Sequence, residues 1–495
     1  MPGGTLQIAS YHVDGPDFTT MNPNITYFKS VHKRYTNFSI ENILVNFNSF
    51  DDSDFYKPMS FNCKLDNIGH LLNNVYLYIE VPTFFQNDIL KIKWIDDIGI
   101  NIIDEITLSI GGEIIQSFSN DWINVYYKRY FTYEEYLSSK KMINIHPSPH
   151  SSKYLNTFNK LYIYLPFYFS KQNGLNVPLM NLKYQDITIN ITLKPISNWL
   201  TIIEQNINSP YYGKRIKPYG EYITLIKNGL DKSRGESFHF SLETHVIFLE
   251  KDELNNITYS QHDYLIENIN EIIINDISDI DTFVKLNQRL PLKEFWLVAM
   301  RNDIYSRNCW GQYSNVENNH EGDLSSPRNN LQSIYTPNQF LYQYWDNIKD
   351  NTNSVMSKNI IKSVKIIIDK NDRTIDLSTN YLSFVNPYQY KLNYNVDEQI
   401  YYYSFSLDPL LYQPSGFCNI DRSSDFILKI SLNNVPPKKP INTFLLQTIN
   451  TQANKDEYQP YTNNIFAWKY TYKLILINYN ILRINSGMAD LLIRK

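Results

Sequence analysis

The stretch Val75-Tyr76-Leu77-Tyr78-Ile79-Glu80-Val81 decides the fold class. Val75, Leu77, Ile79 and Val81 recur at every second position, and side chains at this spacing lie on one face of a β-strand. Such a strand buries its apolar face against a second sheet. The same alternation returns along the whole chain, at residues 106–110, 187–192 and 426–432.

The composition of the 495-residue chain also favours β-structure over helices. Aromatic residues make up 15% of it, and alanine, the best helix former, occurs only at positions 9, 299, 453, 467 and 489. Many short strands separated by Gly, Pro, Asn and Asp clusters are typical of sandwiches and barrels. No alternation of strands with helices is visible, so a Rossmann or TIM-type sheet is disfavoured. The sequence therefore predicts an all-β protein.

Few segments have the pattern of a helix. Ser119-Asn120-Asp121 supplies cap residues ahead of Trp122, Val125, Tyr126 and Arg129, which are spaced as one helical face. Short connecting helices are also predicted at residues 250–255 and around Tyr264–Ile269. Residues 201–239 are rich in Pro, Gly and Lys and form the best candidate for a linker, which would divide the chain into two nearly equal parts.

Charge and cysteine content exclude several classes of protein. The net charge of −4 and the pI near 6.2 give no basic field for nucleic acid. No apolar run reaches ~18 residues, and the N-terminus shows neither a signal peptide nor a myristoylation pattern. Three distant cysteines predict no disulfide framework and a reducing compartment. Cys63 and Cys418 are expected to be buried thiols, whereas Cys309 falls in a loop beside Trp310, a position compatible with exposure.

Motifs for catalysis, phosphate binding or metal binding are missing from the sequence, so no catalytic, cofactor or metal residue is predicted. His146 and His150 could be two metal ligands, but a proline-broken loop without a third ligand favours an exposed loop. Residues 51–54 and Asp96-Asp97 are acidic clusters that we interpret as solvated turns rather than cation sites. Asn24, Asn37, Asn190 and Asn256 match the glycosylation sequon, which chance explains in so Asn-rich a chain.

Different short motifs follow one another in a fixed order along almost the whole sequence. It begins with Gly3-Gly4-Thr5-Leu6-Gln7, Asn22-Pro23-Asn24-Ile25-Thr26 and Arg34-Tyr35-Thr36-Asn37-Phe38. It continues with residues 94–99, 110–115, 121–122, 165–169 and 182–184, then 248–250, 262–267, 385–389, 403–407 and 413–419, and closes at 478–484 and 486–488. Together these motifs resemble the major capsid proteins of nucleocytoplasmic large DNA viruses, the mimivirus- and iridovirus-like double jelly-roll family.

The resemblance implies two consecutive eight-stranded antiparallel jelly rolls, with short connecting helices and long loops. Residues 1–35 would form an N-terminal arm at the base of the capsomer, 36–220 the first jelly roll, 221–239 a linker and 240–495 the second jelly roll. Three chains would form a homotrimer of pseudo-hexagonal outline, and such trimers would tile an icosahedral shell. Residues 138–160, 305–358 and 433–464 are the candidates for loops at the outer surface.

The resemblance also implies the partners and the place of the protein. Beyond its own copies and neighbouring capsomers, it would contact minor capsid and penton proteins and the inner virion membrane at its base, without direct contact to nucleic acid or any cofactor. Assembly would take place in the host cytoplasm and the protein would be part of the virion. The chain departs from the family pattern at Ile100, Gln116 and Ala489-Asp490.

Other functions stay open at this point. A divergent capsid paralogue in a minor shell role would share the same motifs. A glycan-binding β-sandwich protein would also combine this fold with aromatic loops. A sandwich-fold hydrolase would need paired carboxylates across a cleft, and no motif indicates such a pair. Trp94, Trp122, Phe167 and Tyr168 are expected to fill the first barrel, with aromatic anchoring between subunits as the alternative.

Overall fold

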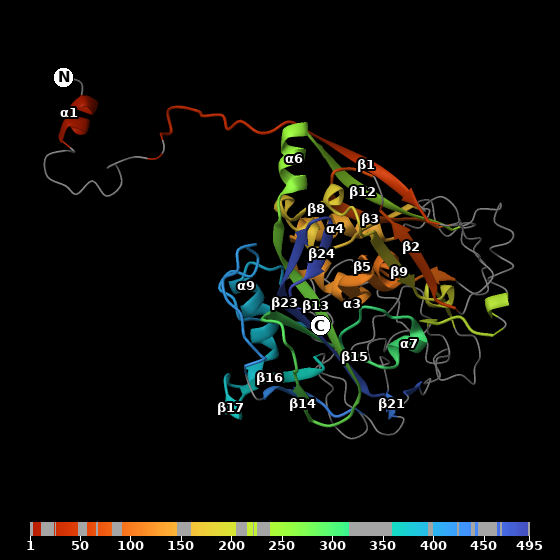
Figure 1. Cartoon of the computed structure of the whole chain (residues 1–495). Coiled ribbons are helices and arrows are strands. Elements are labelled where there is room, and N and C mark those ends of the chain that lie inside the picture. The colour runs from red at the N-terminus through yellow and green to blue at the C-terminus, as the bar shows by residue number, and fades with distance from the viewer. Residues whose placement is uncertain are drawn as a thin grey trace. The chain divides into compact units, whose positions relative to one another are not determined.

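A computed structural model describes the chain at residues 3–10, 24, 26–47, 57–65, 68–81, 92–145, 160–203, 215–220, 222–224, 238–315, 359–394, 399–422, 425–436, 441–443, 463–465 and 468–493. The chain divides into two units, Met1–Phe38 and Ser39–Lys495. The first unit contains helix α1 (Gly3–Ser10) and an exposed segment over residues 26–37. All further elements belong to the second unit (Figure 1).

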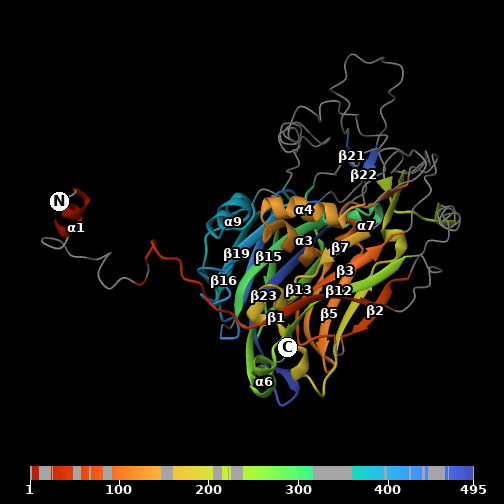
Figure 2. The same cartoon turned by 90° about the horizontal axis from the view of Figure 1, so that it is seen from above.

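Two sheets, each with a row of four strands, face each other across the core of the first half. One sheet has the order β1 (Phe38–Asn46), β12 (His239–Leu249), β3 (Leu71–Glu80) and β7 (Lys160–Tyr164) (Figure 2). The other has the order β2 (Met59–Lys64), β9 (Ile187–Leu193), β5 (Ile103–Ile110) and β6 (Glu113–Ser119). Val75, Leu77 and Ile79 of the opening stretch are buried between them, as their alternation predicts.

The second half repeats this arrangement. One sheet has the order β13 (His262–Ile277), β23 (Tyr470–Asn485), β15 (Leu292–Arg301) and β19 (Ile400–Ser404), with β24 (Met488–Leu491) beside β23. The other has the order β14 (Asp281–Lys285), β20 (Phe426–Leu432), β16 (Ile361–Ile368) and β17 (Asn371–Asp372), with β18 (Leu377–Ser378) beside β16. Their inner faces enclose a second core that includes Phe295, Leu297 and Leu428.

Strand order identifies the topology of both halves. The eight strands of the first half are β1, β2, β3, β5, β6, β7, β9 and β12 in chain order, and those of the second are β13, β14, β15, β16, β17, β19, β20 and β23. In each half one sheet joins the first, eighth, third and sixth strands and the other joins the second, seventh, fourth and fifth. This is the order of a jelly roll, so the fold is a double jelly roll, as expected from the resemblance.

The pairing of β12 corrects the predicted boundary between the halves. We expected the second jelly roll to begin at residue 240, after a linker at 221–239. Instead, Leu242 and Thr244 of β12 lie opposite Leu77 and Val75 of β3. Because hydrogen bonding to β1 and β3 completes the first sheet, this strand is the eighth of the first jelly roll. Residues 221–239 therefore precede the last strand of that jelly roll, and helix α6 (Lys251–Tyr259) connects the two halves.

The remaining short elements lie at the ends of the strands. They are β4 (Lys93–Trp94), β8 (Val177–Pro178), β10 (Leu200–Ile203), β11 (Arg215–Ile216), β21 (Ile441–Thr443) and β22 (Asn463–Ile465), with helices α2 (Ile98–Asn101), α3 (Asn120–Arg129), α4 (Tyr133–Ile143), α7 (Ile304–Arg307) and α9 (Asn386–Gln389). Helical turns are η1 (Tyr168–Ser170), η2 (Asn173–Leu175), η3 (Leu179–Asn181), η4 (Ile196–Asn198) and the π-helical η5 (Tyr381–Val385).

The structure confirms two of the three predicted helices. Ser119 caps α3, because its side chain accepts a hydrogen bond from the Asp121 backbone N–H. The segment after residue 250 forms α6. The helix expected around Tyr264–Ile269 is wrong, because these residues pair with β23 as part of strand β13. The β5–β6 hairpin turns at Gly111 and Gly112, whose φ values of 58° and 85° suit glycine.

Candidate functional site

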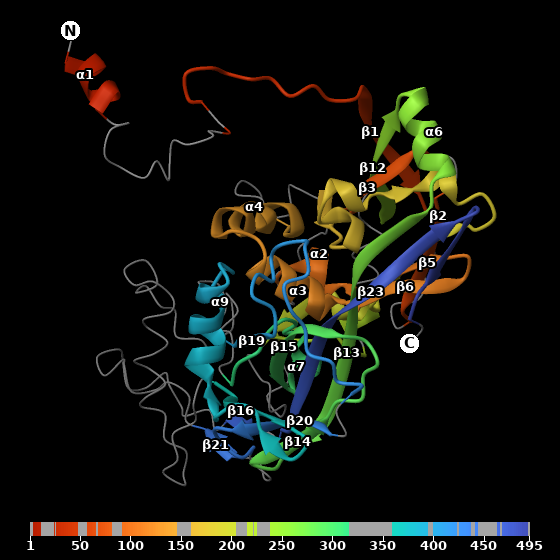
Figure 3. The same ribbon diagram turned by 60° about the vertical axis from the view of Figure 1, so that its left-hand side comes forward.

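The most elaborate site in the described part of the chain is the seam between the two jelly rolls. Helix α3 follows β6 of the first jelly roll and lies beside the sheet β13-β23-β15-β19 (Figure 3), and residues of both belong to one apolar core cluster. The ring of Tyr130 lies 5.8 Å from that of Trp296 on β15. Trp122 and Trp296 are both fully buried. Burial of such large rings makes the seam a continuation of the first core.

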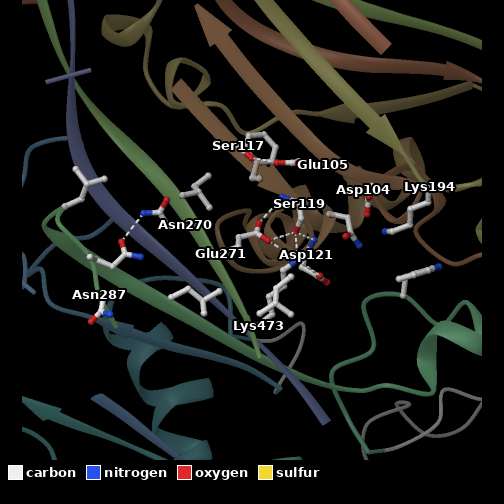
Figure 4. Close-up of a pocket in the computed structure, with 18 of the residues that line it drawn as sticks. Asp104, Glu105, Ser117, Ser119, Asp121, Lys194, Asn270, Glu271, Asn287 and Lys473 are labelled. Carbon is white, nitrogen blue, oxygen red and sulfur yellow. Dashed lines mark hydrogen bonds and ion pairs between the residues drawn. The ribbon is translucent and has the colours of Figure 1, made fainter. Parts of the chain in front are cut away.

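A buried charged cluster holds the seam at Lys473 of β23 (Figure 4). Its Nζ lies 2.9 Å from Asp121 Oδ2 on α3 and 2.9 Å from Glu271 Oε2 on β13. It also donates to Ser119 Oγ at 2.6 Å. Ser119 in turn donates through its backbone N–H and its hydroxyl to the two oxygens of Glu271, at 2.9 and 2.7 Å. One ammonium group therefore joins carboxylates from both halves.

Each charge in this cluster depends on the others. Burial alone would raise the pKa of Asp121, but the Lys473 ammonium outweighs burial and the pKa is lowered. Burial alone would lower the pKa of Lys473, but Asp121 and Glu271 raise it. The Tyr313 hydroxyl also donates to Asp121 Oδ1 at 2.9 Å. Because the ions are nearly withdrawn from water, the loss of one partner would leave an uncompensated buried charge.

A second cluster surrounds Glu267 of β13. The ammonium groups of Lys171, from the first jelly roll, and Lys293, from β15, both donate to its carboxylate. Gln116 of β6 bridges the halves beside it, because its Nε2 donates to the Glu267 backbone carbonyl at 3.1 Å and its Oε1 accepts from the Tyr168 N–H at 3.0 Å. An amide can do both, because it carries a donor and an acceptor.

The third link joins α3 to β15 and β19. Arg129 is fully buried and donates to the backbone carbonyls of Asn393 and Ile400, each at 2.9 Å. Glu294 of β15 accepts from the hydroxyls of Tyr130 and Tyr402, each at 2.5 Å. These three links satisfy polar groups that the seam removes from water, so they fix the two halves in one arrangement.

Acid is expected to weaken the seam through Glu267. Burial raises the pKa of its carboxyl, but Lys171 and Lys293 outweigh burial and lower the pKa from 4.5 to about 2. A lowered folded-state pKa stabilises the protein above the unfolded value and is lost as the pH falls through the folded value. The urea concentration at the midpoint of unfolding should therefore decrease as the pH is lowered from 4.5 to 2. Glu267→Gln should show a shallower fall over this range, and an equal slope in both proteins would contradict this origin.

A cleft of about 930 Å³ opens beside the Lys473 cluster, between the first jelly roll and β13 (Figure 4). It is lined by both halves, including Asp104, Glu105, Lys194, Asn270, Arg289 and Tyr305. Lys194 is buried there, and burial lowers its pKa to about 8. Its Nζ donates to the carbonyls of Asn101 and Ile103, each at 2.9 Å. Among the described residues no group of three or more His, Cys, Asp or Glu could hold a metal ion.

The residues singled out in the sequence lie apart from this seam, with few exceptions. His146, His150 and residues 51–54 lie outside the described residues. Asp97 precedes α2 and forms an ion pair with Lys140. Its carboxylate therefore has a partner within the protein and does not lie simply in a solvated turn. Asn24, Asn37 and Asn256 are exposed and Asn190 is half-buried.

All three cysteines are free thiols, and none of them is exposed. Burial raises the pKa of Cys63 to about 11 and also raises that of the half-buried Cys418. Cys309 is buried, which corrects the expectation that its loop position would leave it exposed. The reason is that the segment after α7 packs on the first jelly roll, where Asn308 donates to the carbonyls of Ser197 and Leu200 at 2.9 Å.

The predicted aromatic residues Trp94, Trp122, Phe167 and Tyr168 are all buried within one chain, which confirms that they fill the core. Sequence reasoning missed Lys473, Glu271, Glu267 and Arg129. A signal was available for Lys473, because it directly precedes the apolar run at residues 474–477 within strand β23. A charge inside a continuous apolar strand needs a buried partner. No described helix is both long and apolar enough to span a membrane.

Comparison with known proteins covers both halves of the chain. Residues 26–225 match the family "Major capsid protein N-terminus", and residues 253–490 match "Large eukaryotic DNA virus major capsid protein". "Probable capsid protein 4" of Acanthamoeba polyphaga mimivirus is 24% identical, over 92% of this chain and 97% of its own. "Major capsid protein" of Paramecium bursaria Chlorella virus 1 is 23% identical, over 99% of both.

Solved structures share the fold. The quasi-atomic model of the PBCV-1 virus capsid superposes with a TM-score of 0.65 at 22% identity, over 95% of this chain and 100% of its own. The Faustovirus major capsid protein superposes with a TM-score of 0.64 at 11% identity, over 97% of this chain and 96% of its own. At these identities the likeness establishes the double jelly roll.

Proposed function

The chain belongs to the family of large eukaryotic DNA virus major capsid proteins, and from this premise we propose that it forms homotrimeric capsomers of pseudo-hexagonal outline that tile an icosahedral shell. Its role is structural and not enzymatic, and it acts in the virion by associating with its own copies. The observation that carries the trimer proposal is the repeated strand order, because two similar barrels in each of three chains supply six similar barrels around one axis.

The seam supports this role. A capsomer transmits load between barrels, and the buried links around Lys473, Glu267 and Arg129 hold the two barrels of one chain in a single arrangement. Large buried interfaces with satisfied polar groups are typical of permanent assemblies. Contacts between trimers would be weaker and more polar, which would allow errors in tiling to be corrected.

We also propose a place and a role in the capsomer for each part of the chain. Residues 1–35 form an arm at the base of the capsomer, the first jelly roll extends to the end of β12, and the second begins with β13. Residues 138–160, 305–358 and 433–464 form the outer crown; most of them lie outside the described residues. At the base, the arm would contact minor capsid and penton proteins and the inner virion membrane, which its Lys29, Lys33 and Arg34 suit. Assembly would take place in the host cytoplasm.

The mass of the purified chain in solution tests the proposed trimer. Size-exclusion chromatography with light scattering should give three times the chain mass of 58.5 kDa at micromolar concentration. Electron microscopy of the same fraction should show particles with a pseudo-hexagonal outline. A monomer under all conditions of salt and concentration would contradict the proposal.

A further inference from the structure

In each jelly roll, the sheet of the first, eighth, third and sixth strands has an outward face. In the second jelly roll, side chains of the first jelly roll cover this face. In the second jelly roll, the outward side chains Trp296, Tyr402 and Ile475 of the sheet β13-β23-β15-β19 are buried in the core cluster of the first half. The sheet β1-β12-β3-β7 holds the same four topological positions in the first jelly roll. The described part of its own chain leaves most of its outward face uncovered.

The outward face of β1-β12-β3-β7 carries apolar and aromatic side chains. On β1, Ile40 and Leu44 are 59% and 52% exposed. On β3 and β7, Tyr76 and Tyr162 are half-buried, and each ring lies tilted against a neighbouring tyrosine, Tyr164 and Tyr78 respectively. The end of β7 meets α3, where the Tyr127 hydroxyl donates to the Tyr164 carbonyl at 3.1 Å. Polar side chains lie among them, with Asn42 donating a hydrogen bond to Glu243 at 3.4 Å, so this face is mixed rather than wholly polar.

The element that covers the second-half sheet has a counterpart as well. Helix α3 connects the fifth and sixth strands of the first jelly roll, and its Trp122, Tyr126 and Tyr130 are spaced as one ridge. In the second jelly roll, η5 and α9 connect the fifth and sixth strands, β17 and β19. Their ridge consists of Tyr381, Val385 and Tyr388, and the last two are 49% and 69% exposed.

We propose that the ridge Tyr381–Tyr388 of one copy packs on the outward face of β1-β12-β3-β7 of the next copy, as α3 packs on β13-β23-β15-β19 within one chain. This inference rests on the proposed homotrimer and names its contact surfaces. The contact is heterologous, so each copy supplies a ridge to one neighbour and a sheet to the other. Heterologous contacts that repeat around an axis close into a ring.

Charge on the sheet face favours a second copy over other occupants. Its charged side chains have both signs and pair with one another, Lys160 with Glu80 at 3.2 Å and His245 with Glu243 at 4.0 Å. A nucleic acid or an anionic membrane would require an excess of basic side chains. The ridge Tyr381–Tyr388 is the complementary surface, because its counterpart on α3 already packs on the equivalent sheet in the seam.

Substitutions on either surface test the proposal. Val385→Arg/Tyr388→Arg on the ridge and Leu44→Arg on the sheet should each raise the dissociation constant of the trimer by roughly 30-fold or more, as loss of an interface hot spot does. Phe283→Arg is the matched control. Phe283 is 62% exposed, but it lies on β14, in the sheet β14-β20-β16-β17 of the second jelly roll, which takes no part in the proposed contact. Circular dichroism and thermal midpoints should show that all variants remain folded. Trimers of wild-type strength from both surface variants would overturn the proposal and leave the homotrimer standing, whereas a monomeric wild type would overturn the homotrimer itself.

Cross-linking separates this contact from any other arrangement of three copies. In a Cys418→Ser background, a chain carrying both Tyr162→Cys and Tyr388→Cys should form covalent dimers and trimers on oxidation. Each single variant should stay uncross-linked, because in the proposed contact position 388 faces the sheet of the neighbouring copy and not its own counterpart. Cross-links in Tyr388→Cys alone, or none in the double variant of a trimeric protein, would overturn the proposal.

Discussion

Replacement of Lys473 by methionine should lower the free energy of unfolding by about 3–5 kcal/mol. Methionine fills a similar volume but removes the ammonium that lies 2.9 Å from both Asp121 and Glu271. The two carboxylates would then remain buried without a cation, or take up protons and lose their hydrogen-bonding pattern. Because one carboxylate belongs to each jelly roll, we expect the seam to be the first part of the protein to open.

Urea unfolding followed by circular dichroism measures this effect, with Lys469→Met as the matched control. Lys469 is four residues earlier and forms an ion pair with Asp276 at 3.1 Å, but its side chain is 52% exposed. Its replacement should cost at most about 1 kcal/mol. The triple variant Lys473→Met/Asp121→Asn/Glu271→Gln should recover part of the loss, because it leaves no unpaired charge. Equal losses in the two lysine variants would contradict the role of the buried cluster.

Replacement of Trp122 by alanine should also cost about 3–5 kcal/mol. Its side chain is fully buried at the point where α3 meets the second jelly roll, and its ring lies 5.9 Å from those of Tyr126 and Tyr130. Truncation would leave a cavity beneath the ridge that covers β15 and β23. Since this ridge joins the halves, the loss should affect the seam as well as the first core.

Thermal and urea unfolding of Trp122→Ala measure the effect, and Tyr133→Ala is the control. Tyr133 lies on the neighbouring helix α4 and is 49% exposed, so its loss should cost less than about 1 kcal/mol. Trp122→Phe should keep most of the stability, because it retains a ring at the same place. A Trp122→Ala variant as stable as Tyr133→Ala would show that the seam does not depend on this ridge.

The boundary between the jelly rolls shows where sequence reasoning reached its limit. Residues 201–239 have the composition of a linker, yet β12 begins at their end and pairs with residues of β3 that lie at least 159 positions earlier in the chain. Alternation identifies a strand, but it does not say which sheet accepts it, because both sheets offer the same backbone groups. The helix expected at Tyr264–Ile269 failed for a related reason, since β13 is buried on parts of both faces and its pattern is mixed.

The sequence by itself determined the strands, the cap of α3 and the family, because these depend on local periodicity, cap residues and ordered motifs. Only the tertiary structure decided the seam. Asp121, Glu271 and Lys473 are separated by at least 150 positions, and their charges have meaning only once two strands and a helix bring them within hydrogen-bonding distance. Burial then converts ordinary surface residue types into the groups that hold two barrels together, since a charge withdrawn from water must find its partner inside the protein.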